Sequence, residues 1–494
     1  MEEFMPYNFK NANLAVRESR LGSITGFTGD LKTLVYRSEC GSLKNRERCF
    51  SQSSSCLSGC ALNALAAIRN VAVVYHAPAG CTAMASNDAV KFGQIAARVN
   101  KTTNSVFVCT DLNENDTVFG AIDSLRKIVQ HTWDEYHPDA IFISTSCVSG
   151  VIGEDVDGLA DELKDEYPVP VIPVHCEGFK SRIWASGFDI SDHAVLQGIV
   201  KPPKQKRRYI NIKNFYESAR PQITKIFNEV FDAEPQFLYC NSTVEELSHL
   251  SENLATVCIC ETLGTYLGNA LEETYGVPYV RTLNHSGITG FETWLRAIGD
   301  TIGKRAEAEA YIEKQRAIFI PQIEEVTKSL HGLRAVIGMG PGFTYEIARV
   351  LQEFGMKVDY ALAWHYDYKY DNGQVPPALE HLVKTAPKDM KVAVADQQNY
   401  EVLNILNRYK PDVYFSRHPG TTVWAIKQGY AAVFVADEYT VFGYEGTLSF
   451  AKLIRDTVTN RSFEKNLAAR IQLPYTKWWY EQNYDKFLKE EGVR

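Results

Sequence analysis

Short runs of β-branched and aromatic residues alternate along this chain with amphipathic segments. The first such block has the strand-like runs VAVVYHA (71–77), SVFVCT (105–110), AIFISTSC (140–147) and VPVIPVHC (169–176). The amphipathic stretch TVFGAIDSLRKIVQHTWDEY (117–136) lies between two of these runs and predicts a helix. Strands that alternate with helices are typical of βαβ units, so we predict an α/β fold with parallel sheets.

The same alternation recurs twice more. The basic, proline-marked stretch VKPPKQKRRYINIKN (200–214) interrupts it and predicts a domain boundary. The second block has the strand-like runs ATVCIC (255–260) and VPYVRT (277–282), followed by a long charged helix from about Gly290 to His331. The third block has the runs LRAVIGMG (333–340), KVDYALAW (357–364), KVAVADQ (391–397), DVYFS (412–416) and AAVFVAD (431–437).

We therefore expect three α/β domains. Their predicted limits are 46–203, 204–331 and 332–460. Residues 1–45 form an N-terminal arm in this division, and residues 461–494 form an aromatic C-terminal tail that packs on a partner or another domain.

Composition excludes several classes of function. The net charge is −8 and the longest basic run is KQKRR (204–208), which disfavours nucleic acid as the main partner. The start MEEFMPYNFK has no basic segment followed by an apolar one, and no window approaches the roughly 20 apolar residues of a membrane span. We expect a cytoplasmic protein without membrane contact, in which the 11 cysteines stay reduced.

The positions of the cysteines separate two groups. Cys109, Cys240 and Cys258 lie in apolar runs, where a free thiol is expected to be buried as a small hydrophobe. Four others follow predicted strands, at the sheet edge where parallel α/β proteins bind ligands: Cys81, Cys147, Cys176 and Cys260. We expect Gly80 to allow close backbone approach and Gly150 to leave room for something bulky beside Cys147.

These thiols leave several metals open. Thiolates favour iron–sulfur clusters, zinc or copper(I), and the absence of a CxxC pair disfavours a zinc knuckle. Burial in the core remains the alternative for each of them.

Specific stretches resemble a known family. They are NALAAIRNVAVVYHAPAGC (63–81), DTVFGAIDSL (116–125), PDAIFISTSCVSGVIGEDVD (138–157), PVIPVHCEGF (170–179) and ALEETYGVPYV (270–280). Together they resemble the component 1 proteins of nitrogenase and its relatives. The resemblance is strong in the first block, good around Cys260 and weak in the third block. It implies three Rossmann-like domains with parallel sheets, the nitrogenase component 1 fold.

The resemblance implies two cluster sites. Cys56, Cys81 and Cys147 match the thiolates that hold half of a P-cluster of the [8Fe-7S] type, shared with a related K-type (beta) subunit in a heterotetramer. Cys60 is then a spare thiol, either in the core or an alternative ligand. Cys260 matches the thiolate by which the D-type (alpha) subunit holds a large iron–sulfur cofactor of the [8Fe-9S-C] type. Electrons would come from a separate ATP-hydrolysing iron protein.

The chain departs from dinitrogen-reducing members around that cofactor. FVADEYTVF (434–442) lacks the family's second cofactor ligand, a histidine, before the turn GYEG (443–446). Trp184 and Phe188 stand where the resemblance places a glutamine and a histidine. Aromatic walls suit an apolar substrate better than proton delivery to dinitrogen. The departures suggest a nitrogenase-like reductase of the methylthio-alkane type, which cleaves carbon–sulfur bonds; ordinary packing is the alternative role for both aromatics.

Another residue could replace the missing ligand. His285, His365 and His418 lie in loops near strand ends, and we favour His365 as a ligand or catalytic group, against structural roles for all three. The glycine-rich GMGPG (338–342) lacks a full GxGxxG, so we predict a tight turn into a helix rather than a dinucleotide site.

Three alternatives to a carbon–sulfur reductase remain. An assembly scaffold that carries an immature cofactor would have the same fold and could equally lack the second histidine. A true nitrogenase alpha subunit fits the departures less well. A cluster-free binding protein fits the placement of the cysteines least.

Overall fold

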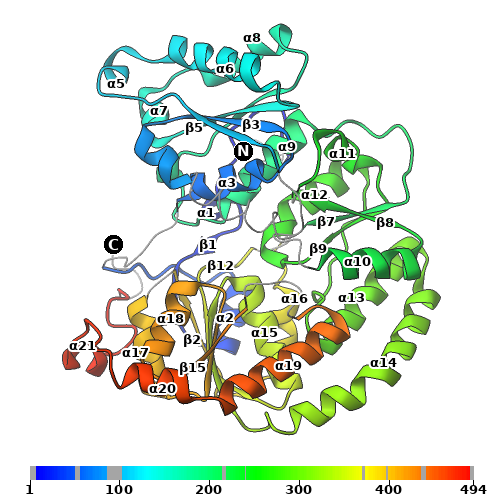
Figure 1. The fold of residues 1–494 in the computed structure, drawn as a ribbon, viewed down its shortest axis with the longest axis vertical. Coiled ribbons are helices and arrows are strands. Elements are labelled where there is room, and N and C mark those ends of the chain that lie inside the picture. Colours follow the sequence, from blue (N-terminus) through cyan, green and yellow to red (C-terminus); the bar gives the residue numbers. More distant parts are fainter. Residues whose placement is uncertain are drawn as a thin grey trace.

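Three sheets form the framework of the molecule. The computed structural model describes residues 7–49, 56–85, 103–213, 219–239, 241–369, 373–396, 399–435 and 441–489. In Figure 1 the first sheet lies in the upper lobe, the second at the right and the third in the lower lobe. The predicted α/β class with parallel sheets is confirmed.

The first sheet is fully parallel, in the order β4-β3-β5-β6. Its strands are β3 (Val71–His76), β4 (Val106–Cys109), β5 (Ala140–Thr145) and β6 (Val171–Val174). One face packs on α3 (Leu57–Ala66) and α9 (Ser186–Gly198), the other on α6 (Ile122–Tyr136) and α8 (Val156–Glu166). Alternate residues of β3 enter the two cores, because side chains of a strand alternate between faces.

The helix predicted over 117–136 is interrupted. The structure has a short α5 (Asp116–Phe119), then Gly120 at φ +81°, then α6. This left-handed conformation suits glycine, so Gly120 ends the first helical turn and redirects the chain.

The second sheet is smaller and parallel, in the order β8-β7-β9. Its strands are β7 (Tyr209–Lys213), β8 (Glu234–Leu238) and β9 (Ala255–Cys258), and its helices are α10 (Arg220–Ile226), α11 (Val244–Ser248) and α12 (Glu261–Tyr275).

Two predictions for this block are wrong. Residues 277–282 do not form the predicted strand, since that segment makes only one bridge, between Tyr279 and Thr256. The single helix predicted from Gly290 to His331 is also wrong. The chain forms α13 (Gly287–Ile302) and α14 (Arg305–Thr327), separated at Gly303, which has φ +74°.

The third sheet has six strands in the order β15-β14-β10-β11-β13-β2. The five runs predicted in the third block all form strands: β10 (Arg334–Met339), β11 (Lys357–Ala363), β13 (Lys391–Ala395), β14 (Val413–Ser416) and β15 (Ala431–Phe434). Its helices are α15 (Pro341–Glu353), α16 (Pro377–Thr385), α17 (Asn399–Tyr409), α18 (Pro419–Lys427) and α19 (Gly443–Thr459).

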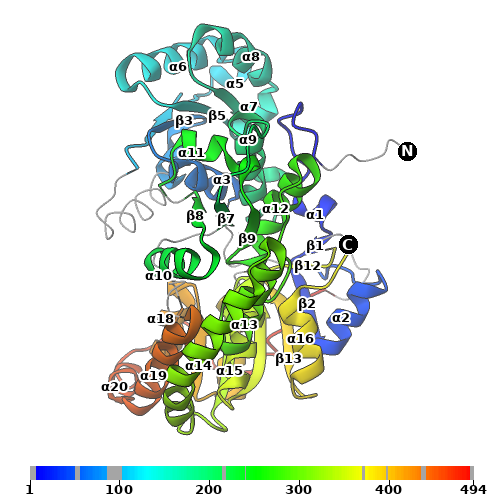
Figure 2. The same cartoon turned by 90° about the vertical axis from the view of Figure 1, so that its right-hand side faces the viewer.

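The N-terminal segment joins this third sheet. β2 (Gly26–Asp30) pairs antiparallel with β13 at the sheet edge and leads into α2 (Leu31–Glu39). Before it, α1 (Arg17–Arg20) is followed by β1 (Ser23–Ile24), which pairs with β12 (Tyr366–Asp367). Figure 2 shows α1, β1 and β12 between the upper and lower lobes. The N-terminal segment therefore pairs with strands that lie more than 300 residues later in the sequence.

The C-terminal tail packs on the lower lobe, which contains the third sheet. It contains α20 (Ser462–Ala468) and α21 (Lys477–Glu481). The amide of Asn404 on α17 donates to the carbonyls of Trp479 at 3.2 Å and Gln482 at 2.6 Å. In the part of the chain that the structure describes, no helix is both long and apolar enough to cross a membrane.

Candidate functional site

Three of the predicted ligands lie at the carboxyl edge of the first sheet. Cys56 is the residue before α3, Cys81 follows β3, and Cys147 begins α7 (Cys147–Ile152). Cys56 and Cys81 are exposed and Cys147 is half-buried. Burial, with the nearby thiols Cys147 and Cys56, raises the pKa of Cys81. The thiols of Cys56 and Cys147 therefore lie near that of Cys81.

Gly178 lies next to two of these thiols, and its role was not predicted from the sequence. A Cβ atom at this position would lie 2.6 Å from the Sγ atom of Cys56 and 3.3 Å from that of Cys147. The absence of a side chain at Gly178 thus leaves the space that both thiols border. The signal in the sequence was the glycine of CEGF, which directly follows a predicted strand.

The surroundings of two other glycines differ. A Cβ atom at Gly80 would meet no atom of the described residues within 4 Å, so the close approach expected there stays a prediction. At Gly150 it would lie 2.6 Å from Cγ of Glu177, so Gly150 makes room for that side chain rather than for a ligand of Cys147.

The donor set fits a polynuclear cluster better than a single ion. Within the described ranges, no three His, Cys, Asp or Glu side chains converge in a group that could hold one metal ion. Thiolates from separate loops are the usual ligands of iron–sulfur clusters, which span several ångströms. Cys56, Cys81 and Cys147 come from separate segments of the chain, before α3, after β3 and at the start of α7.

Other cysteines are turned into the protein. Cys176 is fully buried and its thiol donates to the carbonyl of Thr145 at 3.2 Å, so it belongs to the core. Cys258 is also buried, as predicted. The Cβ atom of Cys60 would lie 2.8 Å from a Cβ at Gly187 on α9, and burial raises the pKa of the Cys60 thiol well above its usual value. Cys240 lies outside the described residues.

Cys260 lies where two helices begin. It is the residue before α12, and a Cβ atom at Gly342 would be 3.1 Å from its Sγ atom. The backbone N–H of Gly342 donates to the Thr262 hydroxyl at 3.0 Å. The GMGPG segment forms the predicted turn into a helix, since Gly340 precedes α15 and Pro341 is its first residue. That turn packs beside the Cys260 thiol.

The structure brings Trp184, Phe188 and His365 together. The Trp184 ring centroid is 5.7 Å from that of Phe188 and 6.3 Å from that of His365. Phe188 also packs in the core of the first lobe, in agreement with its alternative role in packing.

His365 has unused hydrogen-bonding capacity. It is buried, and neither ring nitrogen has a hydrogen-bond partner in the described part of the chain; the same is true of the Trp184 indole nitrogen. The Nε2 atom is 3.7 Å from a carboxylate oxygen of Asp367. Burial lowers the pKa of His365 to about 4 against the opposite effect of Asp367, so the ring is neutral at pH 7. Unpartnered buried nitrogens fit a site that receives a further group.

The other two candidate histidines have different surroundings. The ring of His285 packs against Phe442 at 5.0 Å, and burial lowers its pKa to about 3. The ring of His418 packs against Trp364 at 5.0 Å. Among the described residues, His365 is the one of the three whose ring contacts Trp184. Residues 436–440, in the stretch without the expected histidine, lie outside the described residues.

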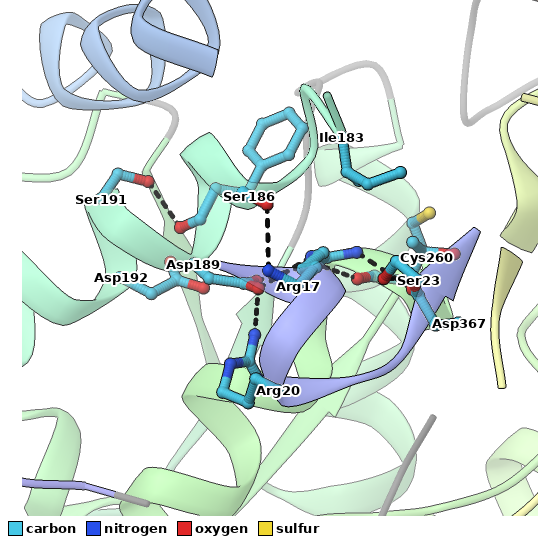
Figure 3. Close-up of polar contacts among 12 residues, drawn as sticks. Arg17, Arg20, Ser23, Ile183, Ser186, Asp189, Ser191, Asp192, Cys260 and Asp367 are labelled. Atoms are coloured by element: carbon cyan, nitrogen blue, oxygen red, sulfur yellow. Dashed lines mark hydrogen bonds and ion pairs between the residues drawn. The ribbon is translucent and has the colours of Figure 1, made fainter. Parts of the chain in front are cut away.

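A buried arginine links this region to the N-terminal segment, as Figure 3 shows. Arg17 on α1 binds Asp189, Asp367 and the carbonyl of Thr262. Nothing in the sequence singled it out, because one arginine in a polar stretch carries no pattern.

Several exposed apolar side chains lie on the segments that carry, follow or pack against the predicted ligands. Val118 and Phe119 on α5 are 73% and 85% exposed, and Val151 on α7 is 78% exposed. Phe179, next to Gly178, is 59% exposed. Val151 lies on α7, which Cys147 begins, and α5 packs against α7; we call the three thiols and these four apolar side chains the thiol face. Exposed apolar patches of this kind mark interaction sites.

Comparison with known proteins identifies the family. The family model described as "Nitrogenase component 1 type Oxidoreductase" matches residues 56–459. The nitrogenase molybdenum-iron protein alpha chain of Methanococcus maripaludis is 26% identical over 364 residues, covering 70% of this chain and 74% of that protein. The nitrogenase iron-molybdenum cofactor biosynthesis protein NifE of the same species is 25% identical over 459 residues, covering 90% of each.

Solved structures agree on the fold. The structure titled "Nitrogenase Cp1 at pH 5" aligns with a TM-score of 0.70 at 18% identity, over 88% of this chain and 94% of that one. The same protein at pH 6.5 aligns with a TM-score of 0.67. The chain therefore belongs to the nitrogenase component 1 type oxidoreductase family.

Proposed function

We propose that this chain is the catalytic, D-type subunit of a nitrogenase-like reductase that cleaves carbon–sulfur bonds of small methylthio-alkanes. The observation that carries the proposal is the contact of Trp184 with both Phe188 and His365. Two aromatic rings beside a buried imidazole form walls that suit an apolar substrate. Family membership supports a reductase or a cofactor scaffold, and these side chains favour the reductase.

The thiol face would receive the electrons. Cys56, Cys81 and Cys147 would hold one half of a P-cluster-type [8Fe-7S] group, and a related K-type (beta) subunit would supply the other half. Three thiolates suffice for only half of such a group, and the exposed Val118, Phe119 and Val151 give a partner an apolar surface. The complex would then be a heterotetramer served by an ATP-hydrolysing iron protein.

Cys260 would hold the large iron–sulfur cofactor. Its position at the start of the 15-residue helix α12 favours a thiolate, because the amino end of a helix attracts negative charge. When bound, the cofactor would supply electrons to the substrate. His365 would contact the cofactor or the substrate through one of its unpartnered ring nitrogens.

The protein residues would exclude water and orient the substrate. Trp184 and Phe188 would hold an apolar thioether, and the neutral His365 would donate a hydrogen bond from a ring N–H to the bound group. With dimethyl sulfide, two electrons and two protons would cleave one carbon–sulfur bond and give methane and methanethiol. The electrons would enter from the iron protein, and both protons would come from solvent.

An assembly scaffold is the second candidate. The observation that favours it is the similarity to NifE, which covers 90% of both chains. A scaffold would carry an iron–sulfur cofactor at Cys260 and transfer it to another protein without turning over a thioether.

A turnover assay separates the two candidates. The complex, purified without oxygen, is mixed with its iron protein, ATP and dimethyl sulfide, and methane and methanethiol are measured. We expect product from the wild type and a large loss of product in Trp184→Leu. The control is Trp478→Leu, at an exposed tryptophan of the tail, which should form as much product as the wild type. Bound iron without any product would favour the scaffold.

A further inference from the structure

Arg17 is an unusual residue for the interior of a protein because its guanidinium group is fully buried. Its Nε and Nη2 atoms donate to the two carboxylate oxygens of Asp189 at 2.7 and 2.6 Å. Nη2 also donates to the carbonyl of Thr262 at 2.6 Å, and Nη1 donates to Asp367 at 3.2 Å. Figure 3 shows Asp189 and Asp367 on either side of Arg17.

The three partners come from three different parts of the fold. Asp189 lies on α9 of the first lobe, and Thr262 lies on α12, beside the second sheet. Asp367 lies on β12, which follows β11 of the third sheet. One side chain from the N-terminal segment thus joins all three lobes at a single point.

Each partner is also a close neighbour in sequence of a predicted site residue. Asp189 directly follows Phe188, Thr262 is two residues after Cys260, and Asp367 is two residues after His365. A shift of any partner would therefore move the backbone that carries one of these three side chains.

We propose that Arg17 is a positioning residue that fixes the positions of Phe188, Cys260 and His365 relative to one another. The inference rests on the proposed function for the nature of the bound group, and on the hydrogen bonds of Arg17 for the positioning itself. In this role the N-terminal segment is part of the cofactor site, although Arg17 touches neither cofactor nor substrate.

The chemistry of the network requires an arginine. A guanidinium offers five donors in a planar fork, whereas an ammonium group cannot serve a bidentate carboxylate and two further acceptors at fixed angles. Burial by itself lowers the pKa of Arg17, but Asp189 and Asp367 outweigh this effect, so the group stays charged. Arg20 also binds Asp189, and the Ser23 hydroxyl donates to Asp367, which completes the pairing of the two carboxylates.

Arg20 provides a matched control for Arg17. It lies on the same short helix and donates to the same carboxylate, but it stacks on the Tyr266 ring and, among the described residues, donates to neither Asp367 nor Thr262. Loss of its guanidinium affects one partner instead of three.

Amide hydrogen exchange of the full-length protein tests the positioning role. In Arg17→Lys we expect about tenfold faster exchange around 186–190, 261–265 and 363–367 together, as expected when hydrogen bonds that fix a segment are lost. In Arg20→Lys only the first segment should change. Ser23→Ala, a milder variant, should affect only 363–367. Faster exchange across the whole chain, or unchanged exchange in two of the three segments of Arg17→Lys, would overturn the inference.

A second readout follows the bound group. The electron paramagnetic resonance spectrum of the Arg17→Lys complex should differ from that of the wild type, while the Arg20→Lys spectrum should match it. Identical spectra of Arg17→Lys and wild type would contradict the inference. If wild-type protein binds no iron, the proposed function fails; coupled exchange of the three segments would then still support Arg17 as the residue that positions them.

Discussion

Replacement of Gly178 by alanine should remove iron from the thiol face while the chain stays folded. The added Cβ atom would lie 2.6 Å from the Cys56 Sγ atom and 3.3 Å from the Cys147 Sγ atom. Ordinary contacts begin at 3.4 Å, so the Cys56 thiol must retreat by about 0.8 Å. Metal–ligand distances tolerate only about 0.2 Å, so this shift is large enough to weaken cluster binding.

The cost to folding should be small by comparison. Overpacking of a rigid core costs about 1–3 kcal/mol, but Cys56 is exposed and its side chain can rotate away. We therefore expect the urea midpoint of the iron-free protein to change little. Iron per protomer, measured after purification without oxygen, should fall clearly below the wild-type value.

Gly80→Ala is the matched control. It introduces the same methyl group beside Cys81, yet the new atom would meet none of the described residues within 4 Å. We expect wild-type iron content for this variant. Wild-type iron content in Gly178→Ala would refute the inference that the three thiols bind one cluster around Gly178.

Three further predictions concern the framework of the site. In Gly187→Ala, the new Cβ would lie 2.3 Å from the backbone carbonyl oxygen of Leu57, so α3 and α9 must separate; urea unfolding should show a loss of about 1–3 kcal/mol, and an unchanged midpoint would argue against this close contact. Asp189→Asn removes a buried carboxylate shared by Arg17 and Arg20 and leaves Arg17 paired with Asp367 alone; it should cost about 3–5 kcal/mol by the same assay, and a loss below about 1 kcal/mol would show that the pairing is dispensable. The pKa of His285 is about 3 in the folded chain because of burial, against 6.5 for an ordinary histidine, so the unfolded chain binds more protons between these values. The free energy of unfolding of the wild type should therefore fall as pH decreases from 6.5 toward 3, and this group contributes up to about 1.4 kcal/mol per pH unit. His285→Phe should show a shallower fall. Equal slopes in the two proteins would contradict the assignment.

Local sequence pattern predicted the strands well where burial is continuous. β3, β5 and β10 read as apolar runs because both of their faces are covered, and each was predicted within one or two residues at its ends. The pattern could not reveal β2. Its residues GFTGD resemble a loop, and its partner β13 lies more than 350 residues away in the chain.

The errors in helices have a common cause. Gly120 and Gly303 adopt left-handed conformations that end a helix, and the amphipathic pattern continues on both sides of each glycine. A glycine within a long amphipathic run is thus a better indication of a break than the pattern alone suggests.

The candidate site was predictable only in part. Resemblance to a family singled out the cysteines and the aromatics at Trp184 and Phe188, and the structure brings these aromatics to His365. Arg17 could not be found this way, since its role depends on three partners that are adjacent only in the folded chain. The assignment of Cys56, Cys81, Cys147 and Cys260 as ligands remains a prediction.

Metal analysis of the complex purified without oxygen tests the central claim most directly. Iron, molybdenum and vanadium are measured per protomer in the wild type and in Cys260→Ala. We predict many iron atoms per wild-type protomer, no molybdenum or vanadium, and a partial loss of iron in Cys260→Ala that leaves the iron of the thiol face in place. Wild-type protein without iron would contradict the account, and equal iron in both proteins would remove Cys260 from it.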